Sequence, residues 1–420
     1  MRTPATQATC PDPSAPRGAA RGAAWTLLLM ASLGSERLLS ADGLRLAVIT
    51  ADGRELRGVA ETVAPDLSLR LEAETVSLPW TDALRIEPVR TAQDDSGTAG
   101  PSPARPPLTF ALSDGSRFAA RVTRDTAGGF EVQARGAALL EVDLTNVREI
   151  VAAGFEAAAQ ARFGSRPAEA QSTEDVVLVS GGDTIRSLPG VIRGVDADGL
   201  RFEWKGRALA IPWSKLAAAR FGRPLESRRP SRVWLRDGDR FAGRVLAGDL
   251  RAIELRTAGS AVLDITWADV LRVENHSERV QYLSEQAPAD YRFEPFFEKR
   301  WEYALDRDLS GKPIRLGQRE YERGVCLHSQ ARLTYALPGD ARLFVATVGV
   351  LDDMRPRGDA VVRVIGDGRM IWEQRIRGSD PPRALAAPIE GVRRLTLVVE
   401  FGEDLDLSDQ VCFADARLIR

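Results

Sequence analysis

The stretch Ala341-Arg342-Leu343-Phe344-Val345-Ala346-Thr347-Val348-Gly349-Val350-Leu351-Asp352-Asp353 decides the fold of the C-terminal third of the chain. Its apolar run ends in an acidic pair, which is typical of a strand that leads into a turn. Similar segments recur at 360–365 and 395–401, and glycine and proline turns separate them. The pattern predicts two antiparallel sheets packed as a sandwich.

The composition excludes several classes of protein. The chain has 420 residues, 44% of them hydrophobic and 28% charged, which is enough to bury cores in two or three domains. Lys+Arg 57 against Asp+Glu 59 leaves a net charge of −2, so no bulk charge favours nucleic acid or an anionic membrane as a partner. Two distant histidines and three cysteines without metal-ligand spacing argue against a zinc centre. No phosphate loop or nucleophile elbow is present, so the sequence predicts a non-catalytic protein.

The N-terminal region 1–41 has the features of a signal peptide. Arginines at 2, 17 and 21 precede a short apolar run at 23–31, and Leu39-Ser40-Ala41 offers an imperfect cleavage site. The run is too short to span a bilayer, and no other segment is suitable for spanning one. We therefore expect an exported protein of the periplasm, cell surface or medium. The alternative is a disordered, proline-rich tail.

Four segments between residues 42 and 275 share one plan. Each begins with a strand in which apolar and polar residues alternate, followed by a tight turn with Gly next to Asp. Further strands follow, and a last short segment closes the repeat. From the turn glycine to the closing position the intervals are 27, 29, 31 and 29 residues. The turns are Asp52-Gly53, Asp114-Gly115, Gly182-Asp183 and Asp237-Gly238, and the closing positions are Trp80, Leu144, Trp213 and Trp267.

Strands of this length joined by tight hairpins are similar to small SH3-like or Sm-like barrels. Because Trp80, Trp213 and Trp267 recur at one repeat position, we expect them to pack, with ligand stacking as the alternative. The expected organisation is repeat 1 at 42–90, repeat 2 at 108–152, repeat 3 at 175–221, repeat 4 at 231–275 and the sandwich at 276–420. The linkers are 91–107, 153–174, where a short helix is expected at 156–163, and 222–230.

Four ordered motifs make residues 280–420 resemble the NPCBM family, carbohydrate-binding modules appended to glycoside hydrolases that include family-98 enzymes. They are Gly324, Cys326 and His328 for the Gly-x-Gly-x-His motif; Phe344, Ala346, Gly349 and Asp352-Asp353 for the second motif; Val364, Asp367 and Gly368 for the third; and Asp409, Asp415 and Ala416 for the closing motif. Cys replaces a glycine in the first motif, and Gln410, Cys412 and Phe413 replace His, Asp and Trp in the last.

The resemblance implies a galactose-binding-like jelly-roll sandwich that binds sugar with the loops at one end. An aromatic ring would stack on a pyranose while polar side chains take its hydroxyl groups. His328 has a structural alternative, as a hydrogen-bonded histidine, and Trp372 an alternative role in packing. The candidate ligand-binding residues are Trp301, Tyr303, His328, Asp352, Asp353, Trp372, Asp409 and Phe413.

Two further expectations follow from the resemblance. Cys326 and Cys412 stand in two family motifs and would form a disulfide in an exported chain, or remain two unpaired buried cysteines. Related jelly rolls hold a structural calcium ion, and here Asp306, Asp308 and Asp415 would supply its oxygen ligands. The alternative for these three is that they are surface turn residues.

The sequence thus favours an exported, non-catalytic protein that binds a glycan or polysaccharide through its C-terminal module. The repeats would serve as spacer or as docking surface for envelope proteins, with no nucleic acid as partner. Two alternatives remain open. One is a structural or protein-interaction molecule of the cell envelope without sugar binding. The other is an unrecognised glycoside hydrolase.

Overall fold

The structure is a computed structural model. It describes residues 43–71, 74–90, 107–134, 139–163, 174–181, 184–222, 230–258, 261–296, 299–403 and 405–420, all within one compact unit, Leu38–Arg420. The expected signal peptide, most of the linkers 91–107 and 222–230, residues 164–173 and the turn at 182–183 lie outside the described residues. The fold is all-β, as the alternation predicts, and no helix in the described ranges is long and apolar enough to cross a membrane.

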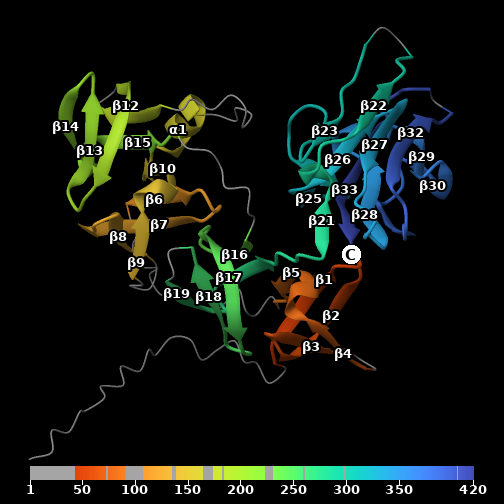
Figure 1. The fold of residues 1–420 in the computed structure, drawn as a ribbon, viewed down its shortest axis with the longest axis horizontal. Coiled ribbons are helices and arrows are strands. Elements are labelled where there is room, and N and C mark those ends of the chain that lie inside the picture. Colours follow the sequence, from red (N-terminus) through yellow and green to blue (C-terminus); the bar gives the residue numbers. More distant parts are fainter. Residues whose placement is uncertain are drawn as a thin grey trace, which may run out of the picture. The chain divides into compact units, whose positions relative to one another are not determined.

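The first 20 strands form four groups of five, which lie within the four predicted repeats (Figure 1). Repeat 1 has β1 (Arg45–Thr50), β2 (Glu55–Thr62), β3 (Asp66–Arg70), β4 (Thr75–Pro79) and β5 (Ala83–Pro88). Repeat 2 has β6 (Leu108–Leu112), β7 (Arg117–Asp125), β8 (Gly129–Gln133), β9 (Leu139–Asp143) and β10 (Val147–Ala152). Repeat 3 has β11 (Asp175–Ser180), β12 (Ile185–Val195), β13 (Gly199–Trp204), β14 (Arg207–Pro212) and β15 (Leu216–Arg220). Repeat 4 has β16 (Ser231–Leu235), β17 (Arg240–Gly248), β18 (Ala252–Thr257), β19 (Val262–Thr266) and β20 (Val270–Glu274).

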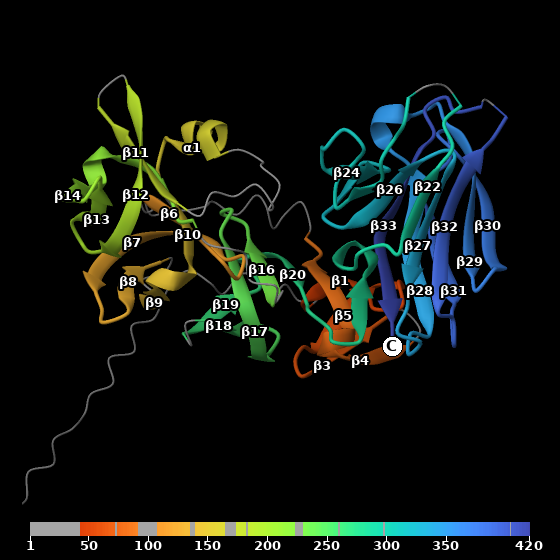
Figure 2. The same ribbon diagram turned by 45° about the horizontal axis from the view of Figure 1, so that its top comes forward.

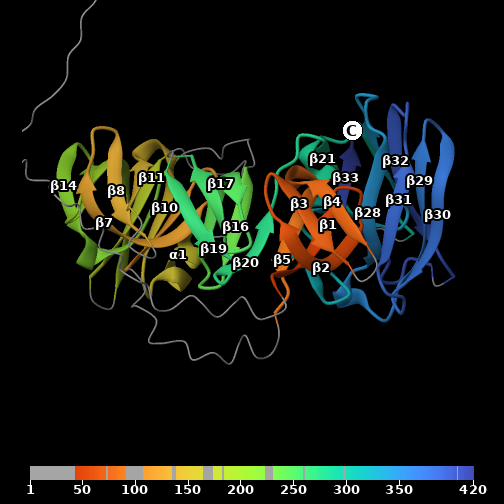
Figure 3. The ribbon, with the colours of Figure 1, turned by 90° about the horizontal axis from the view of Figure 1, so that it is seen from below.

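Within each repeat the first four strands form an antiparallel meander, and the fifth strand pairs with the first. Figure 3 shows the strands of repeat 1 curling around a common centre. In three repeats a short 3₁₀ turn precedes the last strand: η1 (Trp80–Asp82), η3 (Leu144–Asn146) and η5 (Trp213–Lys215). The one α-helix among the described residues, α1 (Glu156–Phe163), follows repeat 2 where a short helix was expected.

The recurring tryptophans pack, as their periodic position predicts. Trp80 and Trp267 are 6% and 3% exposed, and Trp213 packs against the same apolar cluster. The indole Nε1 of Trp267 donates to the carbonyl of Asp249, and that of Trp213 donates to the carbonyl of Ala197, both at 3.0 Å. Each of these two indoles therefore ties the closing turn to an earlier hairpin, and packing rather than ligand stacking explains the recurrence.

The repeats pair with each other at equivalent positions. Strand β5 pairs with β20 at Ile86 and Val273, which joins repeats 1 and 4. Strand β10 pairs with β15 at Ile150 and Ala219, which joins repeats 2 and 3. All four residues lie six positions after the closing position of their repeat, so both pairs form around a local two-fold axis. As a result, the repeat cores merge into one apolar cluster.

A second two-fold contact joins repeats 2 and 4. The backbone N–H of Ala119 donates to Asp239 Oδ1 at 3.1 Å, and the N–H of Ala242 donates to Ser116 Oγ at 2.9 Å. Ser116 and Asp239 directly follow the turn glycines of their repeats, and both are buried. The two hydrogen bonds are therefore reciprocal.

The C-terminal part is a sandwich of two antiparallel sheets around its own core, with a short 3₁₀ turn, η6 (Leu283–Glu285), after its first strand (Figure 2). One sheet has the order β23 (Ala304–Leu305), β26 (Gly324–His328), β33 (Gln410–Ile419), β28 (Leu343–Val350) and β31 (Arg383–Pro388), with β21 (Val280–Tyr282) beside β33. The other has the order β22 (Asp290–Phe293), β27 (Ala331–Ala336), β32 (Arg394–Phe401), β29 (Asp359–Gly366) and β30 (Arg369–Arg377). A separate hairpin consists of β24 (Ile314–Leu316) and β25 (Arg319–Tyr321).

Contacts with repeat 1 lie where β33 ends. The guanidinium of Arg417, 4% exposed, donates to the carbonyls of Thr50 and Ala51 at 3.2 and 3.0 Å. An apolar cluster also joins the two parts, with Ala51 on one side and Val345 and Ile419 on the other. The opposite end of the sandwich, where β33 begins, makes none of these contacts.

Candidate functional site

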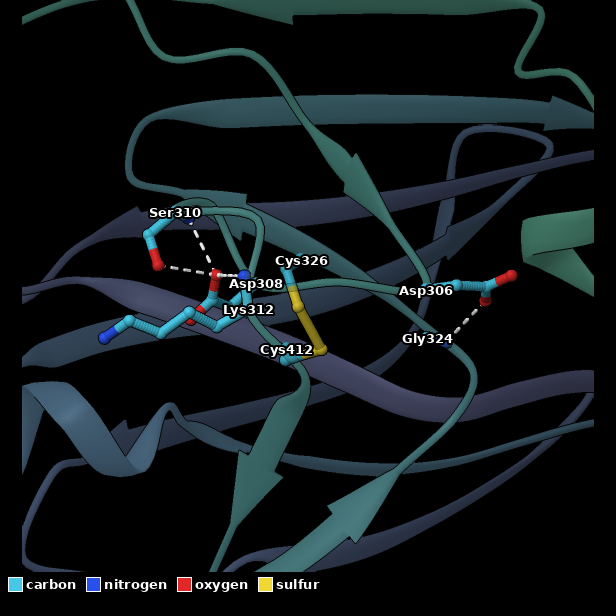
Figure 4. The surroundings of a disulfide bond; sticks show 7 residues. All are labelled: Asp306, Asp308, Ser310, Lys312, Gly324, Cys326 and Cys412. Carbon is cyan, nitrogen blue, oxygen red and sulfur yellow. Dashed lines mark hydrogen bonds between the residues drawn. A yellow bond between two sulfur atoms is a disulfide. The ribbon is translucent and has the colours of Figure 1, made fainter. Parts of the chain in front are cut away.

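A disulfide joins the two strands that carry the first and last sequence motifs. Cys326 on β26 lies opposite Cys412 on β33, with 4.1 Å between their Cα atoms, and both residues are fully buried (Figure 4). This is the pairing that the resemblance implied. The pairing of β26 with β33 also places His328 opposite Gln410, at the end of the sandwich where β33 begins.

Five segments meet at this end, which we call the loop end. They connect strands of the two sheets, and one contains the 3₁₀ turn η7 (Asp352–Met354). The segments are 294–303, 329–330, 351–358, 378–382 and 402–409. Because antiparallel strands alternate in direction, the ends of β22, β26, β28, β30 and β32 all lead into these segments.

His328 is the centre of an aromatic stack at the loop end. Its ring lies parallel to the indole of Trp301, with 4.8 Å between centroids and 7° between planes. Lys299 Nζ lies 3.5 Å from the Trp301 ring centroid, and the ring of Phe293 meets His328 edge-on at 6.4 Å. One His328 nitrogen, Nδ1, lies 2.7 Å from the Ser329 carbonyl. If Nδ1 carries the proton it donates to that carbonyl, and Nε2 is left as an acceptor.

Burial lowers the pKa of His328 below its usual value, because the charged imidazolium would lose solvation. The side chain is only 4% exposed. A neutral ring is therefore the form that the loop end holds near neutral pH.

A buried carboxylate fixes the backbone next to His328. Asp409 is fully buried; its Oδ2 accepts a hydrogen bond from Ser329 Oγ at 2.7 Å, and its Oδ1 accepts one from the N–H of Asp359 at 2.8 Å. Asp359 in turn accepts two hydrogen bonds from Arg375, one of them from Nε at 2.6 Å. These bonds connect two of the five loop-end segments to strands β29 and β30, and they give the site a rigid base.

Exposed apolar side chains surround this polar base. Phe296 is 44% exposed and meets Phe401 edge-on, with 5.7 Å between ring centroids. Leu405 and Leu407 are 50% and 52% exposed on a neighbouring segment. Apolar surface beside fixed polar groups is the usual chemistry of a site that binds a small polar ligand such as a sugar.

Residues 279–419 match the family model of the NPCBM/NEW2 domain. The C-terminal sandwich is an NPCBM/NEW2 domain. A curated relative from Renibacterium salmoninarum, named "Putative endo-alpha-N-acetylgalactosaminidase", is 27% identical over 90 residues, which are 21% of this chain. The match covers only 6% of that relative's length.

Solved carbohydrate-binding modules are also similar to this chain. The CBM51 module of Clostridium perfringens GH95, solved with methyl-galactose, is 25% identical over 33% of this chain and 99% of its own, with a TM-score of 0.30. The tandem CBM51 modules of Sp3GH98 from Streptococcus pneumoniae are 11% identical over 74% of this chain and 99% of their own, also with a TM-score of 0.30. Because these scores are low, the fold assignment rests on the strand order and the family match.

The NPCBM/NEW2 domain brings Trp301, His328 and Asp409 together, and places Tyr303 nearby. The ring of Tyr303 meets Tyr291 edge-on at 5.1 Å, and Tyr291 Oη donates to the Trp301 carbonyl at 2.7 Å. Tyr303 therefore supports the segment that carries Trp301.

Asp352 and Asp353 also lie at the loop end, but both have partners. Asp352 accepts hydrogen bonds from the N–H groups of Gly317 and Gln318, each at 2.7 Å, and so holds the turn between β24 and β25. Asp353 forms an exposed ion pair with Lys312 at 2.7 Å. Asp352 is thus a support of the loop, whereas Asp353 remains accessible.

Two predicted ligand-binding residues lie elsewhere. Phe413 is fully buried because β33 is a central strand and its side chain enters the core, so the predicted ligand contact is wrong. Trp372 lies within β30 opposite Val364 and packs against the same core. A role of Trp372 in packing therefore agrees better with the structure than a ligand contact at the loop end.

The three expected calcium ligands do not come together. Among the described residues, no three acidic, histidine or cysteine side chains form a group suited to a metal ion. Asp308 Oδ1 accepts from the N–H and the Oγ of Ser310 and from the N–H of Lys312, each at 2.8 Å, and Asp306 Oδ1 accepts from Gly324 N–H at 3.1 Å (Figure 4). Asp306 and Asp308 are turn residues, as the alternative proposed. Burial raises the pKa of the Asp415 carboxyl.

Sequence reasoning missed three residues of the loop end: Ser329, Asp359 and Arg375. Ser329 directly follows the motif histidine, and that adjacency was the available signal. Asp359 and Arg375 lie 16 residues apart on paired strands. Their contact depends on the register of β29 and β30, which no local motif encodes.

Proposed function

We propose that this protein binds carbohydrate at the loop end of its NPCBM/NEW2 domain. The observation that carries the proposal is the match of residues 279–419 to this family. The parallel stack of His328 and Trp301 over the Asp409 hydrogen bonds supports the loop end as the place. Binding, without catalysis, is the activity that we assign to this domain.

The polar groups of the loop end suit sugar hydroxyls. His328 Nε2 would accept a hydroxyl proton, and Lys299 would donate to a sugar oxygen. Asp406, whose charge acts on His328, would accept from a further hydroxyl. The exposed ring of Phe296 would cover an apolar face of the pyranose.

The repeats leave this site open. Their contacts with the NPCBM/NEW2 domain include Arg417, Val345 and Ile419, where β33 ends, and Glu322, which precedes β26 and pairs with Arg232 and Arg272. The loop end lies where β33 begins. We therefore assign the repeats a role as spacer, and as the surface that other envelope proteins would contact.

The disulfide supports export. A buried cystine that joins β26 to β33 persists in oxidising compartments and is rare where thiols are kept reduced. The periplasm, the cell surface and the medium all meet this condition.

One observation favours the alternative of a structural protein without sugar binding. His328 covers one face of Trp301 and Lys299 lies over the ring, so the indole is no open stacking platform. In that case the stack would only stabilise the loop end, and binding partners would be proteins.

A glycan panel followed by calorimetry of the full chain tests the proposal. The panel includes galactosides and N-acetylhexosaminides, each with calcium and with a chelator. We expect saturable binding that falls at least tenfold in the His328→Phe variant. This variant keeps an aromatic ring against Trp301 but removes both ring nitrogens.

The matched control is Met370→Ala, because Met370 is 61% exposed and lies on β30, away from the loop end. It should bind as the wild type does. Loss of binding with chelator alone would assign calcium to ligands other than the Asp306, Asp308 and Asp415 set. A folded protein that binds nothing across the panel would overturn the proposal.

A further inference from the structure

Two arginines lie next to each other where repeats 2 and 4 join, and among the described residues neither forms an ion pair with an acidic side chain. Arg117 on β7 lies directly opposite Arg240 on β17, at the centre of the local two-fold contact. Side chains that face each other in this way on antiparallel strands are close neighbours, and like charges there are unfavourable. The contact therefore places two positive groups side by side.

A tryptophan holds one of these arginines together with two others. Three guanidinium carbons lie within 6 Å of the Trp234 ring centroid: Arg272 at 4.2 Å, Arg232 at 5.0 Å and Arg240 at 5.7 Å. Stacking on an aromatic ring orients the planar guanidinium groups and reduces the entropy they would lose on binding. We call Arg117, Arg232, Arg240 and Arg272 the arginine cluster.

Two carboxylates lie against this cluster, and both are already paired. Arg272 Nη2 binds Glu322 at 2.8 Å, and Arg272 Nε lies 3.2 Å from Glu274. Arg232 Nη2 lies 3.4 Å from Glu322 and 3.6 Å from Glu274. These two carboxylates thus balance Arg232 and Arg272.

The remaining two guanidinium groups have unused donors. Arg240 Nε donates to the Gly115 carbonyl at 2.8 Å. Within the described ranges, no acceptor binds the terminal nitrogens of Arg240 or any nitrogen of Arg117. Burial and the positive charge of Arg232 lower the pKa of Arg240, but a guanidinium group remains charged at neutral pH.

We propose that the arginine cluster binds an oxyanion: a sulfate, phosphate or carboxylate group, either free or carried by an acidic polysaccharide. The planar donors of Arg117 and Arg240 match the oxygen geometry of such a group. An anion bound there would offset the two positive charges and satisfy the free donors. This site lies in the repeats and does not depend on sugar binding by the NPCBM/NEW2 domain.

Thermal unfolding of the full chain in sodium sulfate, against sodium chloride of equal ionic strength, tests the proposal. Sulfate should stabilise the wild type in a saturable way, because a ligand that binds only the folded state raises its stability. The Arg117→Gln variant should weaken the apparent sulfate affinity about tenfold, which is the effect of losing one charge-assisted contact. Without sulfate this variant should be at least as stable as the wild type, because a like-charge neighbour is gone.

The matched control is Arg121→Gln, which removes the same charge from an exposed position of the same strand. It should leave the sulfate affinity unchanged. A second variant, Arg240→Lys, keeps the charge but loses the planar fork, and it should also weaken sulfate binding. Equal effects of Arg117→Gln and Arg121→Gln, or no saturable effect of sulfate, would overturn the proposal.

Competition separates the two sources of the anion. Dextran sulfate and polygalacturonate are added to the sulfate-bound protein, with neutral dextran as reference. Displacement by the two acidic polymers, but not by dextran, would assign the site to a polysaccharide group. If neither polymer competes while sulfate still binds through Arg117, the ligand is a free anion.

Discussion

The repeats and the NPCBM/NEW2 domain are both antiparallel β-structures, but they use their aromatic residues differently. In the repeats, Trp80, Trp213 and Trp267 recur at one position and pack on a core that all four repeats share. In the NPCBM/NEW2 domain, Trp301 and Phe296 recur nowhere and lie at the loop end, beside His328. The comparison shows that recurrence at a fixed spacing identifies aromatic residues that pack in the core. The aromatic residues of the candidate site can be recognised only from the side chains that surround them in the folded structure.

The largest expected effect is on the stability of the NPCBM/NEW2 domain, which contains a disulfide. The Cys326→Ala/Cys412→Ala variant should lose about 4 to 5 kcal/mol of unfolding free energy in the NPCBM/NEW2 domain, because the disulfide links residues 86 apart. Chemical denaturation with and without reductant measures this loss. Reductant should destabilise the wild type but not the double variant. A destabilised repeat region with an unchanged sandwich would contradict the comparison.

The second prediction concerns the shared core of the repeats. Phe118 is 1% exposed and lies between Phe110 and Phe241, with ring centroids at 6.0 and 5.1 Å. Phe118→Ala should cost about 3 to 4 kcal/mol by leaving a cavity where repeats 2 and 4 meet. Denaturation should show this loss in the repeat transition alone. The control Val262→Ala, at a residue 51% exposed on β19, should change stability by less than about 0.5 kcal/mol.

The third prediction concerns the base of the loop end. The hydrogen bonds from Arg375 hold the pKa of Asp359 below its usual value, so the folded state favours the carboxylate. Arg375→Gln should lower the free energy of unfolding at neutral pH, because Asp359 would lose both hydrogen bonds from Arg375. The stability from this pair is present above the unfolded pKa of about 4 and is lost as the pH falls through the lowered folded value.

Denaturation between pH 2 and pH 7 should therefore show a smaller acid loss in Arg375→Gln than in the wild type. The neighbouring Arg377→Gln is the control, because Arg377 is 51% exposed and lies 3.9 Å from Asp359. An acid profile that is the same in all three proteins would show that Asp359 is not held by Arg375.

The smallest predicted effect comes from His328. Because burial lowers its pKa, the unfolded chain takes up a proton at this residue before the folded chain does. Stability should therefore fall slightly as the pH drops from about 6.5 through the lowered folded pKa. His328→Phe should remove that dependence, whereas His276→Gln, at the chain's other histidine, should not. An unchanged profile in His328→Phe would mean that the imidazole is not buried as a neutral ring.

Much of the fold was predictable because it depends on local patterns. Alternation and turn glycines placed the strands of the repeats, and the spacing to Trp80, Trp213 and Trp267 predicted their packing. Which repeats pair with each other was not predictable. The Ile86–Val273 contact joins the edges of two strands that are far apart in the chain, and no local pattern encodes such a contact.

The candidate site was predictable only in part. The motifs identified His328 and Asp409, and they also placed Cys326 and Cys412 within bonding reach. The predicted ligand contact of Phe413 was wrong, because a motif position does not tell which face of a strand its side chain is on. In β33 the Phe413 side chain lies in the core. The Asp359–Arg375 pair depends on strand register, which the sequence does not display.

The measurement that tests the central claim most directly is hydrogen–deuterium exchange of the full chain with and without the tightest-binding sugar of the panel. The account predicts slower exchange in the loop end, at 294–303, 329–330 and 402–409, and unchanged exchange in the repeats. Protection confined to the repeats or to the β29–β30 hairpin, or no protection at any sugar concentration, would contradict it.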